Sequence, residues 1–253
     1  MRNETNAMNQ TNPTPPSSLT LTSLIVTNSL LTQALPAAQL SVEAQHERNA
    51  SQGQMLTGLG VYKGRKPLIL VRALLLAALI PIQKEEDIHQ ALEIFELLMG
   101  FDNESLAKRC LEKNPPLKEL LPLIDAAQFQ EILTLKNNKV SWQGKPSREE
   151  KLKLYRAVMA NPTLTYQEKS QFGKRPEECD STFLYAHIWD KVNAYLGTNA
   201  QNHHELVQQL GQKYAGRNLR VGDVFCGGGS VPFEAARLGF DIYASPCART
   251  AAA

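Results

Sequence analysis

The sequence predicts a mostly helical N-terminal region followed by one strand–helix–strand unit of an α/β fold. Two observations support this prediction. Between residues 41 and 214 apolar residues recur mainly at helical spacing, whereas 219–245 contains two β-favouring segments around a glycine turn and a short helical segment. The chain therefore divides into a flexible low-complexity tail at 1–38, a helical region at 39–215 and a β-α-β unit at 216–253.

The C-terminal unit has the order strand, glycine turn, helix, strand. We expect these elements at 219–225, 226–230, 231–238 and 241–244. Pro232 suits the first turn of the helix, because the N–H that proline lacks has no helical partner there, and Gly239 suits its end. The three glycines tolerate positive φ and let a ligand approach the backbone, and the helix start adds free N–H groups. The order is typical of cofactor-binding units, although a tight turn without a ligand would need similar glycines.

The helical region contains several segments with helical periodicity or helix-start residues. We expect helices at 41–54, 68–79, 85–99, 104–112, 117–135, 151–160, 182–196 and 202–214, with the fifth broken or restarted at Pro122 and a weak helix possible at 24–35. Ser41 is a candidate cap for the first of them, and 147–150 fits a helix start. Residues 137–147 read as a loop.

Composition limits the class of protein. The hydrophobic share of 43%, the charged share of 21% and the net charge of +2 describe a soluble globular protein and do not by themselves argue for nucleic-acid binding. The four cysteines form no C-x-x-C pair, which favours reduced thiols over disulfides or zinc. The most apolar run, 67–82, is short and contains Arg72, so we read it as a buried helix and expect no membrane span. With no secretory pattern at the N-terminus, we expect a cytoplasmic protein.

Three other patterns have both a functional and a structural interpretation. The loop before Pro67 contains three glycines together with Lys63, Arg65 and Lys66, and it could bind phosphate at a helix start, although composition alone favours a solvated basic loop. Residues 114–117 read Asn-Pro-Pro-Leu and lack the aromatic residue of an amine-holding loop, so we interpret them as a helix start. His203 and His204 are adjacent and lack the i, i+4 spacing of a helical metal pair, and His187 beside Trp189 reads as a core histidine.

Three strings together resemble the adenine-specific DNA methylases, which use S-adenosylmethionine and carry a long helical region ahead of the cofactor motif. These strings are residues 53–72, the A-H-I-W-D-K-V-N segment at 186–193, and F-C-G-G-G-S-V-P-F-E-A-A-R-L-G at 225–239. The resemblance implies that the C-terminal unit is the first β-α-β unit of a Rossmann-like methyltransferase fold.

The resemblance also implies a cofactor site and a reaction. The cofactor-binding residues would be Asp223, Phe225, Cys226, Gly227, Gly228, Gly229 and Ser230. Residues 232–234 would fix the following helix. The implied reaction moves a methyl group from S-adenosylmethionine to an exocyclic amine of DNA, most simply adenine N6, after the base leaves the duplex. We add our own inference that Arg65 and Lys66 contact the DNA backbone.

The sequence departs from this family after Ser245. The residues that follow include neither the acid that would bind the ribose nor an Asn-Pro pair, and the chain has no Asx-Pro-Pro-aromatic loop. It supplies only two strands of a larger sheet. We therefore assign no catalytic and no metal-binding residue, and expect a C-terminally truncated methylase fragment that is inactive alone or is completed by a second chain carrying the missing strands. The alternatives are a non-catalytic DNA- or protein-binding helical module and a broken gene product.

Overall fold

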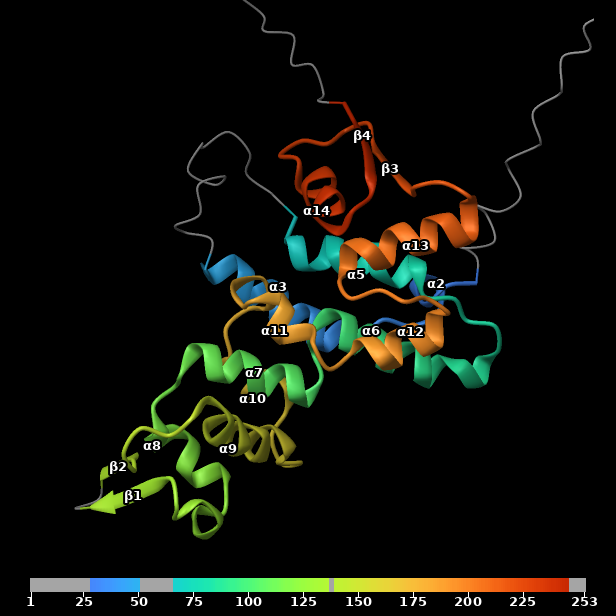
Figure 1. Ribbon diagram of the computed structural model, residues 1–253. Coiled ribbons are helices and arrows are strands. Elements are labelled where there is room, and N and C mark those ends of the chain that lie inside the picture. The colour runs from blue at the N-terminus through green and yellow to red at the C-terminus, as the bar shows by residue number, and fades with distance from the viewer. Residues whose placement is uncertain (1–27, 51–65, 137–138, 246–253) are drawn as a thin grey trace, which may run out of the picture.

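The computed structural model describes residues 28–50, 66–136 and 139–245 (Figure 1). This part of the chain is mostly helical and contains two sheets of two strands each, so the prediction of a mostly helical region is confirmed. In the described residues no helix is both long and apolar enough to cross a bilayer.

The helices follow one another along the described chain with few interruptions. They are α2 (Leu30–Gln33), α3 (Ala37–Ala50), α5 (Leu68–Leu79), α6 (Ile88–Met99), α7 (Asn103–Lys113), α8 (Leu117–Leu120), α9 (Arg148–Ala160), α10 (Tyr166–Gln171), α11 (Ser181–Tyr185), α12 (Trp189–Leu196), α13 (His203–Ala215) and α14 (Ser230–Leu238). Single 3-10 turns lie at Glu85–Asp87, Leu121–Leu123, Ala126–Phe129 and Pro176–Glu178. The strands are β1 (Leu133–Lys136), β2 (Lys139–Trp142), β3 (Arg220–Asp223) and β4 (Asp241–Ala244).

Two hydrophobic cores hold these elements together. The first joins α2, α3, α5 and α6 to α11–α14, and it includes Leu30 near the start of the described chain and Leu238 near its end. The second joins α7, α8 and α9 to the β1–β2 hairpin and forms the lobe at the lower left of Figure 1. The strand–helix–strand unit packs on the first core at the opposite end of the molecule (Figure 1).

A buried ion pair connects α7 of the second core to α3 of the first. Arg109 Nη2 donates to Glu43 Oε1 at 2.6 Å, and both side chains are almost completely buried. Tyr166 donates its hydroxyl to the same carboxylate oxygen at 2.7 Å, and Arg109 Nε donates to the carbonyl of Lys174 at 2.7 Å. Burial alone would lower the pKa of Arg109, but Glu43 raises it above its usual value. The network therefore holds a permanent cation between the two cores.

Several predicted helix boundaries are confirmed. The apolar helix begins directly after Pro67 and ends at Leu79. Ser147 and Glu150 form the expected capping box of α9. The Asn-Pro-Pro-Leu segment starts a helix as predicted, because α8 begins at Leu117 directly after Pro116. Asn114 also ends α7 in the left-handed conformation with φ 53°, and its side chain accepts from the Tyr155 hydroxyl at 3.3 Å.

Other predictions were wrong, each for a local reason. Residues 133–136 and 139–142 pair as antiparallel strands instead of forming helix and loop, with Leu133 opposite Trp142, because Leu133, Val140 and Trp142 pack against the second core. The predicted helix 182–196 is two helices, α11 and α12, separated by a turn at 186–188. Ser41 lies inside α3, which begins at Ala37, and does not cap it. Residues 28–38 do not form the predicted tail, because Leu30 of α2 is fully buried in the first core; residues 1–27 lie outside the described chain.

The histidines lie in polar or packed settings, and no described group of three His, Cys, Asp or Glu could hold a metal ion. The prediction that His187 is a core residue was wrong. Its Nε2 lies 3.0 Å from Asp102 Oδ2, and its Nδ1 lies 3.0 Å from Lys108 Nζ. Among the described cysteines Cys110, Cys179 and Cys226 carry free thiols, and burial raises the pKa of Cys179 to about 11. Cys247 lies outside the described residues.

His203 begins α13 and packs edge-on against the rings of Tyr185 and Trp189. Its Nε2 donates to the carbonyl of Leu98 at 2.9 Å, which requires a proton on Nε2. Burial lowers the pKa of this histidine to about 4, although the bond to Leu98 opposes the shift. The folded protein therefore holds His203 neutral at pH values where an unfolded histidine is already protonated.

This difference predicts acid sensitivity in a defined pH window. Between about pH 6.5 and 4 the unfolded state binds one more proton than the folded state, so stability is full above this window and falls as the pH is lowered through it, by about 1–3 kcal/mol. We expect urea unfolding of His203→Gln to lose less stability between pH 7 and pH 4.5 than wild type does. The exposed His89→Gln is the control and should follow wild type; parallel curves for all three proteins would contradict this account.

Candidate functional site

The predicted C-terminal elements lie close to their expected positions. β3 and β4 pair in parallel with Val221 opposite Ile242, and α14 runs between them along the chain. The residues opposite each other at the strand ends are Asp223 and Ala244. Val221 and Ile242 pack against the first core, as do Ala235 and Leu238 of α14. The turn between β3 and α14 is therefore held on a packed support.

Hydrogen bonds define the turn that follows β3. The Phe225 amide donates to Asp223 Oδ1 at 3.1 Å, and the Gly229 amide donates to the carbonyl of Cys226 at 2.7 Å. On the β4 side the Ser245 amide donates to the carbonyl of Asp223 at 3.0 Å. The Asp223 carboxylate thus shapes the turn, and only part of it is free for a ligand.

Two glycines in this turn have backbone conformations that favour glycine. Gly227 has φ 49° and Gly229 has φ 77°. A Cβ atom built at Gly229 would meet no atom within 4 Å, so packing inside the described chain does not explain this glycine. Gly229 also precedes α14 without giving a side-chain cap, which leaves the first N–H groups of the helix without a capping side chain.

The structure brings all seven predicted cofactor residues together, because they are neighbours in sequence. Phe225 is 78% exposed, Gly227 and Gly228 are exposed, and Asp223, Cys226 and Gly229 are half-buried. Ser230 is buried at the start of α14. The surface offers two glycines with positive φ, a helix N-terminus and one apolar ring at the ends of two parallel strands. In open α/β sheets this is where ligands bind.

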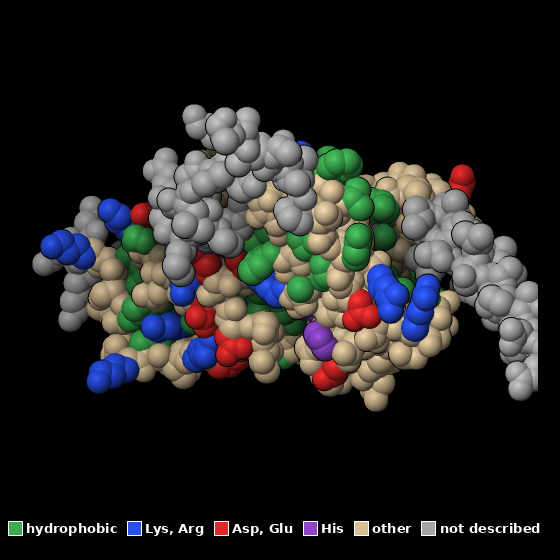
Figure 2. Space-filling view, turned by 90° about the horizontal axis from the view of Figure 1, so that it is seen from above, with side chains coloured by type: hydrophobic (Ala, Val, Ile, Leu, Met, Phe, Trp, Pro, Cys, Tyr) green, Lys and Arg blue, Asp and Glu red, His purple; other side chains and the backbone are tan. Residues whose placement is uncertain are grey.

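Large apolar side chains gather around the turn. Val224, Phe225, Phe233 and Tyr243 are each between 49% and 78% exposed, and Leu74 of α5 is 48% exposed. The view from above shows hydrophobic side chains on this face (Figure 2). A second chain that completes the sheet stays a prediction; these side chains are the surface that it would cover.

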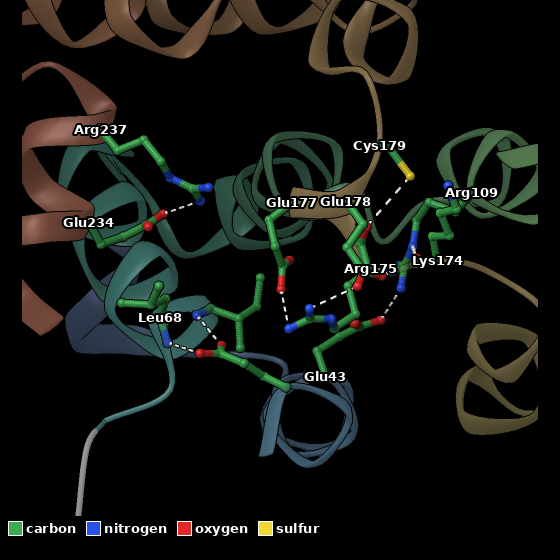
Figure 3. Close-up of polar contacts among 12 residues, drawn as sticks. Glu43, Leu68, Arg109, Lys174, Arg175, Glu177, Glu178, Cys179, Glu234 and Arg237 are labelled. Atoms are coloured by element: carbon green, nitrogen blue, oxygen red, sulfur yellow. Dashed lines mark hydrogen bonds and ion pairs between the residues drawn. The ribbon is translucent and has the colours of Figure 1, made fainter. Parts of the chain in front are cut away.

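A buried ion pair holds α14 on the helical region. Arg72 Nε donates to Glu234 Oε1 at 2.7 Å, and the two side chains are 7% and 0% exposed. Arg237 adds a second contact to the same oxygen at 2.8 Å (Figure 3). Burial raises the pKa of the Glu234 carboxyl although Arg72 opposes this, and Glu234 raises the pKa of Arg72. This contact joins the predicted cofactor string to the apolar helix α5.

Of the two predicted DNA-binding residues in the basic loop, the structure describes Lys66. Arg65 lies outside the described residues, and Lys66 is exposed directly before Pro67. The N-terminus of α5 already has an anionic partner, because Glu47 accepts from the amides of Leu68 at 2.8 Å and Ile69 at 3.0 Å. A phosphate at this helix start would have to displace that carboxylate, so any DNA contact of Lys66 would be made by its side chain.

Sequence reasoning did not find the Arg72–Glu234 pair. The available signal was an arginine inside the most apolar run of the chain, since a buried arginine needs a carboxylate or several carbonyl oxygens as partners. That signal shows that a partner exists and does not identify it.

The comparisons with known proteins cover part of the helical region. A family model described as "Protein of unknown function (DUF1156)" matches residues 34–98. The matched segment contains α3, α5 and α6, and thus Glu43, Glu47 and Arg72. No curated protein and no solved structure matches the chain. The carboxylates that hold α5 and α7, and the arginine that holds α14, therefore all lie in the segment that the family model describes.

The Arg72–Glu234 pair can be tested by a double-mutant cycle. Removing one partner leaves the other charge buried, so Arg72→Met and Glu234→Leu should each lower the free energy of unfolding by about 3–5 kcal/mol. The double variant should be at least about 2 kcal/mol more stable than the sum of the single effects, because it leaves no unpaired buried charge between these helices.

The control for this cycle is Arg220→Met, which breaks the exposed 3.8 Å pair with Asp241 and should cost less than about 1 kcal/mol. Unfolding can be followed by circular dichroism in urea. Additive effects of Arg72→Met and Glu234→Leu would show that the two side chains do not depend on each other.

Proposed function

We propose that this chain carries part of an S-adenosylmethionine site and serves methyl transfer to an exocyclic amine of DNA. The observation that carries the proposal is the turn between β3 and α14, where Gly227 and Gly229 have positive φ and Gly229 has open space above its backbone. Its order of strand, glycine turn, helix and parallel strand supports a Rossmann-like β-α-β unit. The resemblance of residues 225–239 to the adenine-specific DNA methylases names the cofactor and the reaction.

The residues of the turn fit the proposed cofactor. The open space at Gly229 admits a ligand to the backbone, and the N–H groups at the uncapped start of α14 suit the carboxylate of an amino-acid moiety. Phe225 offers an exposed ring next to these groups. When bound, S-adenosylmethionine would supply the methyl group from its sulfonium centre.

In this proposal the chain's own residues bind the cofactor and orient the groups around it. Asp223 fixes the turn through the Phe225 amide, and its second carboxylate oxygen has no bond to another described residue. Glu234 and Arg72 fix the direction of α14, so that the N-terminus of this helix stays beside the glycines. No described residue takes the role of an acid or base, and orientation is the contribution that these groups can make.

Cofactor binding can be tested with a valine at Gly229. A valine there would be strained at φ 77° and its branched side chain would fill the open space, so calorimetric binding of S-adenosylmethionine should fall at least about tenfold. The control is Gly144→Val, since Gly144 has φ 67°, a similarly open surrounding and a place in the other lobe. If wild type binds no S-adenosylmethionine, or if Gly229→Val binds it as tightly as Gly144→Val does, the proposed site is wrong.

DNA binding can be tested separately at Lys66. If its ammonium group contacts one phosphate, Lys66→Ala should reduce the slope of log Kd against log salt by about 0.9. Lys118→Ala removes an exposed lysine from the second-core lobe and should leave the slope unchanged. Fluorescence anisotropy with a labelled duplex measures both slopes. Equal slopes for wild type and Lys66→Ala would remove this residue from the DNA interface.

A further inference from the structure

A cavity of about 590 Å³ lies where α5, α11, α12, α13 and α14 meet. Its lining includes Arg72, Tyr185, Trp189, His203 and Arg237. No lining residue belongs to the glycine turn, so the cavity and the proposed cofactor site are separate places. Its volume falls in the range that small organic ligands occupy.

Buried polar atoms at this cavity lack partners. Tyr185 is 4% exposed, and its hydroxyl has no hydrogen-bond partner among the described residues. Arg72 is 5% exposed and uses Nε for Glu234, whereas its two Nη groups make no hydrogen bond to another described residue. A buried hydroxyl group normally has a hydrogen-bond partner, so the Tyr185 hydroxyl is a donor that a ligand can satisfy. The Nη groups of Arg72 are further donors at the wall of the cavity.

The hydrogen-bond donors around the cavity suit an anion. Arg72 and Arg237 line it and share one carboxylate, that of Glu234, so each guanidinium group keeps further N–H groups. Glu177 also lines the cavity, and its carboxylate is paired at 3.0 Å with Arg175, which also pairs with Glu178. The charges of these three arginines and three glutamates balance, so an anion would be held by the remaining N–H groups of Arg72 and Arg237.

The N-terminus of α13 adds free amide groups and the positive end of a helix dipole to the cavity. Asn202 caps this 13-residue helix by accepting from the Glu205 amide, which leaves the amides of His203 and His204 at the cavity end without a capping side chain. Two guanidinium groups, one hydroxyl and one helix N-terminus from four different helices therefore converge on the same space.

We propose that this cavity binds a small organic molecule through a phosphate or carboxylate group, held by Arg72, Arg237 and the Tyr185 hydroxyl. The uncharged part of the ligand lies against Trp189, Tyr185 and Leu238. Because the ligand contacts α5, α13 and α14 at once, its binding strengthens the attachment of the strand–helix–strand unit to the helical region. The site does not depend on the function proposed for the glycine turn.

Calorimetry on the full chain can test this site with four probes. Adenosine 5′-monophosphate, inorganic phosphate and succinate carry the expected anion, whereas adenosine lacks it. We expect binding of adenosine 5′-monophosphate together with at least one of the two smaller anions, and none of adenosine. If phosphate binds and succinate does not, the ligand carries a phosphate group. If succinate binds and phosphate does not, the ligand carries a carboxylate group.

Two variants connect the binding to the cavity. Arg237→Gln and Tyr185→Phe should each weaken binding about tenfold, by removing a charge-assisted and an ordinary hydrogen bond. Both should fold, because Arg72 still neutralises Glu234 and the Tyr185 hydroxyl has no described partner to lose. Arg217→Gln removes an exposed arginine outside the cavity and should bind as wild type does.

Gly229→Val separates this site from the glycine turn and should leave binding of the anions unchanged. The inference is overturned if none of the three anions binds at millimolar concentration, or if adenosine binds as tightly as its monophosphate. It is also overturned if binding survives Arg237→Gln and Tyr185→Phe, or if it is lost only in Gly229→Val.

Discussion

The Arg72–Glu234 pair is the contact on which the arrangement of the whole molecule depends. Burying a charged side chain is costly unless it is paired or hydrogen-bonded, and these two residues lie 162 positions apart in the chain. Arg72 stands on α5, which also packs on α2, α3 and α6, and Glu234 stands on α14 between the two parallel strands. The direction of α14 determines where the open N-terminus beside Gly229 faces. A geometric requirement of one buried carboxylate therefore fixes the position of the candidate site.

Two further buried carboxylates, on α3 near the start of the matched segment, also fix neighbouring helices through polar contacts. On α3, Glu43 neutralises Arg109 of the second-core lobe and Glu47 satisfies the first amides of α5. One helix with little amphipathic character thus positions both neighbours through charge and hydrogen bonds, with less apolar burial than α5 or α6 contributes. Such contacts are directional, so they define orientation more strictly than hydrophobic packing does.

How much of the structure the sequence predicts depends on how far apart the interacting residues are. The bounds of α5 and the strand–turn–helix order at Gly229 depend on local features, a proline, an apolar run and consecutive glycines, and these were predicted closely. The strand pair 133–136 and 139–142 was missed because each strand has four residues, too few for a clear alternating pattern. The Arg72–Glu234 pair and the cavity around Tyr185 bring together residues from helices that are far apart in the sequence. The periodicity of one segment cannot predict such long-range contacts.

The long separation between Arg72 and Glu234 also has a consequence during protein synthesis. At about 5–20 residues per second, Glu234 leaves the ribosome roughly 10–30 s after Arg72. During that interval the growing chain exposes the face of α5 that Ala235 and Leu238 later cover, and its arginine has no carboxylate to pair with. The first core closes only when its last helix arrives. A nascent chain of this protein therefore presents an apolar, cationic surface, of the kind that chaperones bind, for most of its translation.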